Sequence, residues 1–268
     1  MSVVEFRPDR DRPNMLHLVA DQVTQATIDL DDPTYLDAEY MQRMTYLIDA
    51  ILSAGQPVRT YHLGGGALAM ARYIAATRPR SFQQAVEPNQ EIIEKLRHDA
   101  PLRRGVKVKI RSGDARDELT AAPDDCYELI ISDVYERAQV PAHLTTVEFL
   151  QQVKRVLRPD GYYTVNLCDS GKMQYVKSCL AAMAAEFDHL VLMAEPAVLR
   201  GRRYGNIVVC AADQALPEES MRRRAAGAPF PCRVVSGSEL TKYIGHAKPF
   251  TDGTAQTSPP PPRTWREN

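Results

Sequence analysis

Apolar residues recur along the chain with two different periods, and the two kinds of segment alternate. Short apolar runs typical of strands lie at residues 58–63, 82–86, 106–111, 127–132 and 162–167. Helical periodicity, with an apolar residue every three or four positions, follows residue 66 and occupies residues 34–54, 90–100, 147–157 and 173–187. This alternation predicts an α/β domain with a mostly parallel sheet and helices on both faces. Two later strands, at residues 190–194 and 206–212, can pair antiparallel.

The pattern changes toward both ends of the chain. Residues 15–20 and 23–29 predict a β-hairpin in front of the main domain, and the charged, proline-broken residues 1–12 are expected to be loosely ordered. Beyond residue 212 only short elements are expected, at 217–226, 232–235 and 239–244, before a polar, proline-rich tail that predicts disorder. The predicted divisions are an N-terminal arm and hairpin (1–33), a cofactor-binding catalytic domain (34–212), a C-terminal extension (213–246) and a disordered tail (247–268).

A glycine turn, Gly64-Gly65-Gly66, follows the first strand of the main domain. Glycine lets the backbone turn sharply close to a ligand, and a helix that begins there directs its free N–H groups to the same place. The next strand ends at Glu87, where a carboxylate can accept hydrogen bonds from the two hydroxyls of a ribose. The order predicts a pocket for a nucleoside cofactor. The spacing from Gly64 to Ala69 also fits the dinucleotide fingerprint, and a turn that only begins a helix would look the same.

Acids also follow the next two strands. Asp114 comes after the strand at 106–111, and Asp133 comes directly after the strand at 127–132. Ligands of such sheets bind beyond the carboxyl ends of the strands, so we expect Glu87, Asp114 and Asp133 to line one site. Each acid alone could instead cap a helix or form a turn.

Composition and charge narrow the class of protein. The chain has 268 residues, of which 44% are hydrophobic and 25% are charged, which suffices for a full core. Its formal net charge of -1 gives no global basic field, so we expect no nucleic acid and no membrane as partners. A charged N-terminus and the lack of a long apolar run predict a cytoplasmic protein. The five cysteines show no CxxC or Cys/His cluster, so we expect free thiols and no metal site.

A series of segments, taken in order, resembles one family. They are HLGGG (62–66), VEPN (86–89), SGDARD (112–117), LIISDVYERAQVPAHLTTVEF (129–149) and LRPDGYYTVNL (157–167). With the preceding hairpin and the Pro-Ala pair in the loop after Asp133, residues 15–212 are similar to the spermidine synthase (polyamine aminopropyltransferase) family. The resemblance implies the Rossmann-like fold of S-adenosylmethionine-dependent methyltransferases, with a mostly parallel seven-stranded sheet behind an N-terminal β-hairpin. The Gly113-Asp114 pair is not expected of a nicotinamide enzyme, which disfavours the dinucleotide interpretation.

The resemblance also implies a ligand set. The implied donor is S-adenosylmethionine or its decarboxylated form, and the implied acceptor is a small amine similar to putrescine. The residues implied to bind the donor are Gln25 over it, Gly64, Gly65 and Gly66 below it, Glu87 at its ribose, and Asp114 and Ala115 at its adenine. Asp133 is implied to deprotonate and orient the attacking amine, with Tyr40 beside that amine and Glu136 as a second acid. A homodimer is left open.

Some positions depart from the family pattern. Ala67 replaces an acid that holds the cationic end of decarboxylated S-adenosylmethionine, Glu136 replaces an aspartate, and Met41 replaces a polar residue after Tyr40. Polyamines are polycations, so their binding requires several carboxylates at spaced positions. The leading prediction is aminopropyl transfer to a polyamine. Methyl transfer, which Ala67 favours, and cofactor binding without catalysis stay open as alternatives.

The chemistry of transfer from a sulfonium requires little covalent help. The enzyme must align donor and acceptor and supply an unprotonated nucleophile. Asp133 is the candidate that accepts or relays the proton of an amine. Tyr135 is a second loop residue of interest, and His143 is an alternative base because imidazole titrates near neutrality. Tyr135 could instead be a solvated loop residue, and His143 could be a loop residue held near the start of the next helix.

Overall fold

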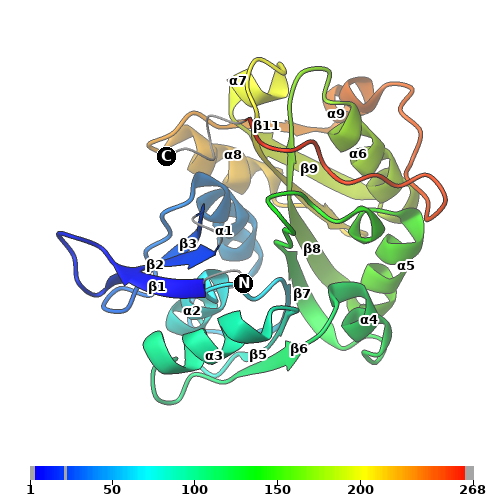
Figure 1. The fold of residues 1–268 in the computed structure, drawn as a ribbon. Coiled ribbons are helices and arrows are strands. Elements are labelled where there is room, and N and C mark those ends of the chain that lie inside the picture. Colours follow the sequence, from blue (N-terminus) through cyan, green and yellow to red (C-terminus); the bar gives the residue numbers. More distant parts are fainter. Residues whose placement is uncertain (1–3, 21–22, 263–268) are drawn as a thin grey trace.

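A computed structural model describes residues 4–20 and 23–262 and has one large sheet at its centre (Figure 1). The parallel part consists of β4 (Arg59–Leu63), β5 (Phe82–Glu87), β6 (Val108–Ser112), β7 (Tyr127–Ser132) and β8 (Leu157–Asp169). The antiparallel part consists of β9 (His189–Ala194), β10 (Gly205–Ala212) and β11 (Arg233–Ser236). The strand order is β11-β9-β10-β8-β7-β4-β5-β6.

The predicted α/β, Rossmann-like architecture is confirmed, but the expectation of a seven-stranded sheet is wrong. The sheet has eight strands, because β11 adds an antiparallel edge strand beside β9, and it is mixed, because β10 also pairs antiparallel with β8 and β9. Val234 packs into the core on one face of the sheet and Val235 into the core on the other. Burial of both valines on opposite faces explains why this short segment joins the sheet instead of remaining a surface extension.

Helices cover both faces of the sheet, as Figure 1 shows. One face packs against α4 (Ala115–Thr120), α5 (Val147–Val156), α6 (Gln174–Glu186) and α9 (Gly237–Ile244). The other packs against α1 (Glu39–Ile51), α2 (Ala69–Thr77), α3 (Gln90–Asp99) and α8 (Glu218–Ala226). A short helix, α7 (Pro196–Leu199), precedes β10, and a 3-10 turn, η1 (Ala142–Leu144), precedes α5. No helix in the described part of the chain is long and apolar enough to cross a membrane.

Two-sided coverage explains why the central strands are continuously apolar. In β10, Ile207 and Val209 pack into one core while Val208 and Cys210 pack into the other. All four side chains are buried. A strand buried on both faces loses the alternation of apolar and polar residues that a half-exposed strand shows.

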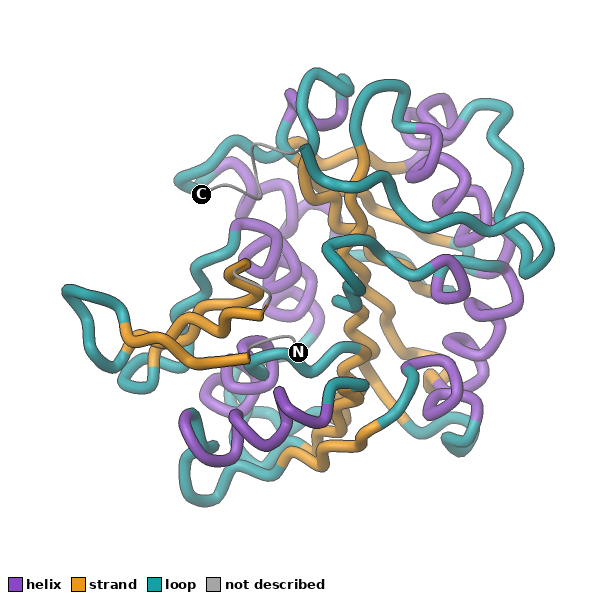
Figure 2. The backbone as a smooth tube through the Cα atoms, viewed as in Figure 1, coloured by secondary structure: helices purple, strands orange, loops and turns teal. Residues whose placement is uncertain are grey.

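A small antiparallel sheet precedes α1 and lies apart from the main sheet (Figure 2). Its strands are β1 (Val4–Pro8), β2 (Met15–Ala20) and β3 (Val23–Asp29), so the predicted hairpin gains a third strand within residues expected to be loosely ordered. The reason is that Val4 is buried in the core that also contains residues of α3. Leu18 pairs with Ala26 and Val19 with Thr24, so Gln25 is the extra residue of a β-bulge. Residues 21 and 22, at the hairpin tip, lie outside the described residues.

The tail also differs from the sequence-based expectation of disorder. Residues 247–262 follow a defined path against the body of the protein, with Ser258 only 1% exposed. Phe250 packs against Tyr175 with ring centroids 5.8 Å apart. The carbonyl oxygen of Phe250 accepts a hydrogen bond of 2.9 Å from the N–H of Val147. Residues 263–268 of the predicted tail lie outside the described residues.

The ends of β4 and β7 approach each other too closely for any side chain at Gly64. The N–H of Asp133 donates to the carbonyl oxygen of Leu63 over 2.8 Å. A Cβ atom on Gly64 would lie 2.2 Å from the carbonyl oxygen of Asp133, and Gly64 has a φ of +91°. Both constraints require glycine, and together they bring the glycine turn against Asp133.

We predict that Gly64→Ala destabilises the fold by at least about 2 kcal/mol, because left-handed strain and a backbone clash add. Gly55→Ala is a matched control, since Gly55 has a φ of +84° but nothing lies within 4 Å of its Cβ position. The control should cost only about 1 kcal/mol, from strain alone. Urea unfolding of both variants measures the difference. Equal losses would show that the contact with Asp133 does not matter.

Candidate active site

The glycine turn and Glu87 form one hydrogen-bonded unit. Oε2 of Glu87 accepts from the N–H of Gly66 over 2.9 Å, and Oε1 accepts from the N–H of Asn89 over 3.0 Å. A Cβ on Gly65 would lie 2.9 Å from the Cβ of Glu87, so the turn lies directly on this side chain. Glu87 therefore holds the turn in shape. Because each carboxylate oxygen has two lone-pair directions, both can still accept from a ribose hydroxyl.

The residue directly after the glycine turn is Ala67, where the family resemblance implies an acid. Ala67 is 1% exposed, and Leu68 precedes α2 with a φ of 58°, in the left-handed region. Arg72 of α2 is buried and donates over 3.2 Å to the carbonyl oxygen of Ala67. Packing explains the small side chain at position 67, which offers a methyl group and no charge.

Asp133 lies at the end of β7, between two hydrogen-bond donors. Tyr40, from the first turn of α1, donates its Oη–H to Oδ2 over 2.9 Å, and Asn166 of β8 donates from Nδ2 to Oδ1 over 3.1 Å. Burial raises the pKa of Asp133, and the hydrogen bonds from Asn166 and Tyr40 oppose that rise. Asp133 is thus a carboxylate whose pKa lies above its ordinary value and whose two oxygens are oriented by fixed donors.

Asn166 is the site residue that the sequence analysis missed. It is 1% exposed and lies between Val165 and Leu167 in the buried half of β8. Its Oδ1 accepts no hydrogen bond within the described part of the chain. The available signal was a single amide in the strand YYTVNL, because a buried polar residue in a central strand needs a partner.

The remaining residues predicted around Asp133 are only partly brought together. Tyr40 contacts Asp133, whereas Glu136 is exposed at the start of a tight turn on the following loop. That turn is closed by hydrogen bonds between the backbone groups of Glu136 and Gln139, of 2.8 and 3.0 Å. Met41 is buried in the core beneath α1, so packing explains its apolar side chain.

Asp114 combines a helix cap with a contact to the loop. Oδ1 accepts from the N–H of Arg116 over 2.8 Å and from that of Asp117 over 3.2 Å, which caps α4. Oδ2 lies 2.8 Å from Nε2 of His143. Partial burial raises the pKa of Asp114, but hydrogen bonds from His143 and from the backbone outweigh this effect and leave the pKa lowered. The lowered pKa favours the ionised form of Asp114, whose oxygens only accept hydrogen bonds.

The last two predicted residues, Ala115 and Gln25, lie on different elements. Ala115 is buried at the start of α4, beside the capping carboxylate of Asp114. Gln25 is exposed on the bulge of the small sheet. A bulge re-aims a side chain, and this property suits a residue that reaches over a ligand.

Comparison with known proteins gives a consistent result, although no protein-family model matches the chain. The chain is 28% identical over 214 residues to a polyamine aminopropyltransferase of Chromobacterium violaceum. This match covers 78% of this chain and 77% of that protein. Its fold matches a human methyltransferase-like protein 13 in complex with SAH, with a TM-score of 0.58, 20% identity and coverage of 80% and 96%.

A closer likeness in structure is to a probable spermidine synthase from Corynebacterium glutamicum. The TM-score is 0.86, and the match covers 94% of each chain at 33% identity. The chain therefore belongs to the spermidine synthase-like (polyamine aminopropyltransferase) family, on the Rossmann-like fold of S-adenosylmethionine-dependent methyltransferases.

Proposed function

We propose that this transferase moves the aminopropyl group of decarboxylated S-adenosylmethionine to a small diamine of the putrescine type. The observation that carries the proposal is Asp133, whose backbone lies against the glycine turn and whose carboxylate, of raised pKa, is fixed by Tyr40 and Asn166. Family membership supports aminopropyl transfer over methyl transfer. The electrostatics fit, since a carboxylate attracts a cationic amine and can take its proton.

The residues present also fit a nucleoside donor. Glu87 would bind the ribose, because its carboxylate oxygens keep free lone pairs. The lack of a side chain at Gly65 leaves room for Glu87 beside the turn. Asp114 would accept from the exocyclic amine of adenine through Oδ2, with Ala115 against the ring. Gly64 and Gly66 would form the floor of the site. Gln25 would cover the donor from the small sheet.

The chain's own residues account for the demands of the reaction. Bound, the donor supplies an electrophilic methylene carbon on a sulfonium that leaves as a neutral thioether. Asp133 holds the acceptor ammonium, takes one of its protons and directs the nitrogen lone pair toward that carbon. The C–N bond forms as the C–S bond breaks, so 5′-methylthioadenosine and the extended amine are the products. Tyr40 and Asn166 orient the carboxylate during this step, and Glu136 on the adjacent loop would attract the distal ammonium.

Methyl transfer is the second candidate, and the observation that favours it is Ala67. Its buried methyl group cannot pair with the free ammonium end of a decarboxylated donor. The two reactions use different donors and leave different nucleoside products. A protein that only binds the cofactor would give neither.

Product analysis separates these functions. With putrescine and decarboxylated S-adenosylmethionine we expect 5′-methylthioadenosine and spermidine in equal amounts, detected by mass spectrometry. With S-adenosylmethionine we expect little turnover. Formation of S-adenosylhomocysteine with a methylated amine would instead establish methyl transfer. Absence of turnover with both donors, despite nucleoside binding, would reject the enzyme assignment for these acceptors.

Asp133→Asn should lower kcat roughly 10²-fold, the scale typical of losing a positioned general base. The change keeps the shape of the side chain but removes its charge and its ability to take a proton. Affinity for 5′-methylthioadenosine, measured by calorimetry, should change much less. Higher pH should partly restore the rate, because free amine is then supplied by solvent. A variant that loses rate and nucleoside affinity in proportion would make Asp133 a binding residue.

Tyr40→Phe should move the acid limb of the kcat/KM profile to higher pH. Its hydroxyl hydrogen bond favours the charged form of Asp133 and so lowers the pKa of that group. Without it, burial acts with less opposition and the pKa of Asp133 rises further above its ordinary value. The titration of the diamine is the same for both enzymes, so the difference between their profiles isolates Asp133. Superimposable profiles would contradict a role for Asp133 as the base.

A further inference from the structure

The C-terminal segment (residues 250–258) contacts the loop that follows Asp133 at two places. Near the end of that loop, the N–H of Val147 donates to the carbonyl oxygen of Phe250 over 2.9 Å. Nearer to Asp133, Val140 donates its N–H to Oγ of Ser258 over 2.9 Å and accepts from the N–H of Ser258 over 3.2 Å. Residues 134–146, here called the site loop, are thus held from outside near their middle and at their C-terminal end.

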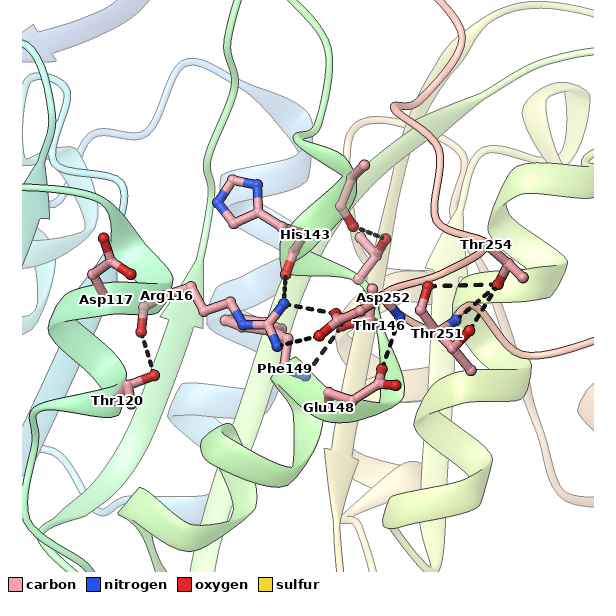
Figure 3. A network of polar contacts seen from close by, with 12 residues as sticks. Arg116, Asp117, Thr120, His143, Thr146, Glu148, Phe149, Thr251, Asp252 and Thr254 are labelled. Atoms are coloured by element: carbon pink, nitrogen blue, oxygen red, sulfur yellow. Dashed lines mark hydrogen bonds and ion pairs between the residues drawn. The ribbon is translucent and has the colours of Figure 1, made fainter.

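Asp252 makes the strongest of these contacts, shown in Figure 3. Its carboxylate receives both guanidinium nitrogens of Arg116, over 2.7 and 2.8 Å, and the Oγ1–H of Thr146 over 2.8 Å. Its N–H donates to Oε2 of Glu148 over 3.0 Å. Paired hydrogen bonds between arginine and a carboxylate fix orientation as well as distance. Asp252 therefore links the first turn of α4 to the N-cap of α5.

A chain of contacts leads from this ion pair to the proposed adenine site. Nη1 of Arg116 also donates to the carbonyl oxygen of His143 over 3.3 Å, as Figure 3 shows. The ring of His143 in turn contacts Oδ2 of Asp114 over 2.8 Å. The oxygen proposed to meet the adenine amine is thus held through His143 and Arg116 by Asp252.

Ser258 contacts the middle of the site loop. Its hydroxyl lies 3.2 Å from Sγ of Cys168, in β8 two residues beyond Asn166, and the side chain of Gln139 donates to its carbonyl oxygen. Directly before Gln139 the loop contains Arg137 and Ala138 with φ of 49° and 61°. Non-glycine residues persist in that left-handed region only when surrounding contacts hold them.

We propose that Asp252 and Ser258 are positioning residues of the active site, which hold the site loop in its donor-binding conformation. The part of this proposal that concerns turnover and nucleoside binding rests on the proposed function, while the part that concerns loop order does not. The segment that composition predicts to be disordered is then a component of the site. Neither residue acts on the reacting atoms.

Asp252→Asn in the full chain tests the ion pair, with Asp252→Glu as the conservative variant. Asp213→Asn is the matched control, because Asp213 forms an ion pair of similar exposure with Lys154, which the site does not use. We expect Asp252→Asn to raise the KM for the donor and the Kd for 5′-methylthioadenosine roughly tenfold, the scale of coupling through neighbouring contacts. kcat should stay within about twofold. Asp252→Glu should recover part of the affinity, and Asp213→Asn should bind as the parent does.

Hydrogen exchange of the ligand-free protein provides a readout that does not need activity. Amides of the site loop should exchange faster in Asp252→Asn and in Ser258→Ala, whereas those of β4 and β5 should not. Unchanged exchange in the site loop, or a loss of thermal stability with unaltered KM and Kd, would overturn the proposal and leave the segment a structural feature only. Failure of the parent protein to form 5′-methylthioadenosine would reject the proposed function, while exchange would still decide whether the segment holds the loop.

Discussion

The close approach of the ends of β4 and β7 is the constraint on which the site depends. A hydrogen bond from Asp133 to Leu63 joins the two strand ends, and Gly64 has no room for a side chain beside the Asp133 carbonyl. The turn that would lie beneath a nucleoside and the carboxylate that would meet an amine are therefore set by the same backbone contact. In a parallel sheet the carboxyl ends of the strands lie at one edge. Residues from distant parts of the chain, proposed to bind the nucleoside and the amine, therefore meet there.

The polar groups of the site are balanced between burial and hydrogen bonding. Burial raises the pKa of Asp133, and the hydrogen bonds from Asn166 and Tyr40 oppose that rise. The pKa of Asp114 is lowered instead, because hydrogen bonds from His143 and from backbone N–H groups outweigh the effect of burial. Two acids that look alike in the sequence thereby differ in the direction of their pKa, which is raised at Asp133 and lowered at Asp114.

Structural and functional interpretations of the acids do not exclude each other. Glu87 holds the glycine turn through Gly66 and Asn89, and Asp114 caps α4. These contacts engage only part of the lone-pair capacity of each carboxylate. A site built in this way is already shaped before a ligand binds, since the groups that would contact it are fixed by backbone donors.

The sequence by itself determined the α/β class, the glycine turn and the acids at successive strand ends, because periodicity and turn chemistry are local properties. It did not reveal Asn166, whose partner Asp133 lies on a neighbouring strand, or the place of β11, which depends on an edge left free by β9. The order of the C-terminal segment was hidden for the same reason. Its polar composition predicts disorder, whereas Arg116 and Val140, more than a hundred positions earlier in the chain, supply its partners. Only the tertiary structure brings such residues together, because hydrogen bonds across that separation leave no periodic signal in the sequence.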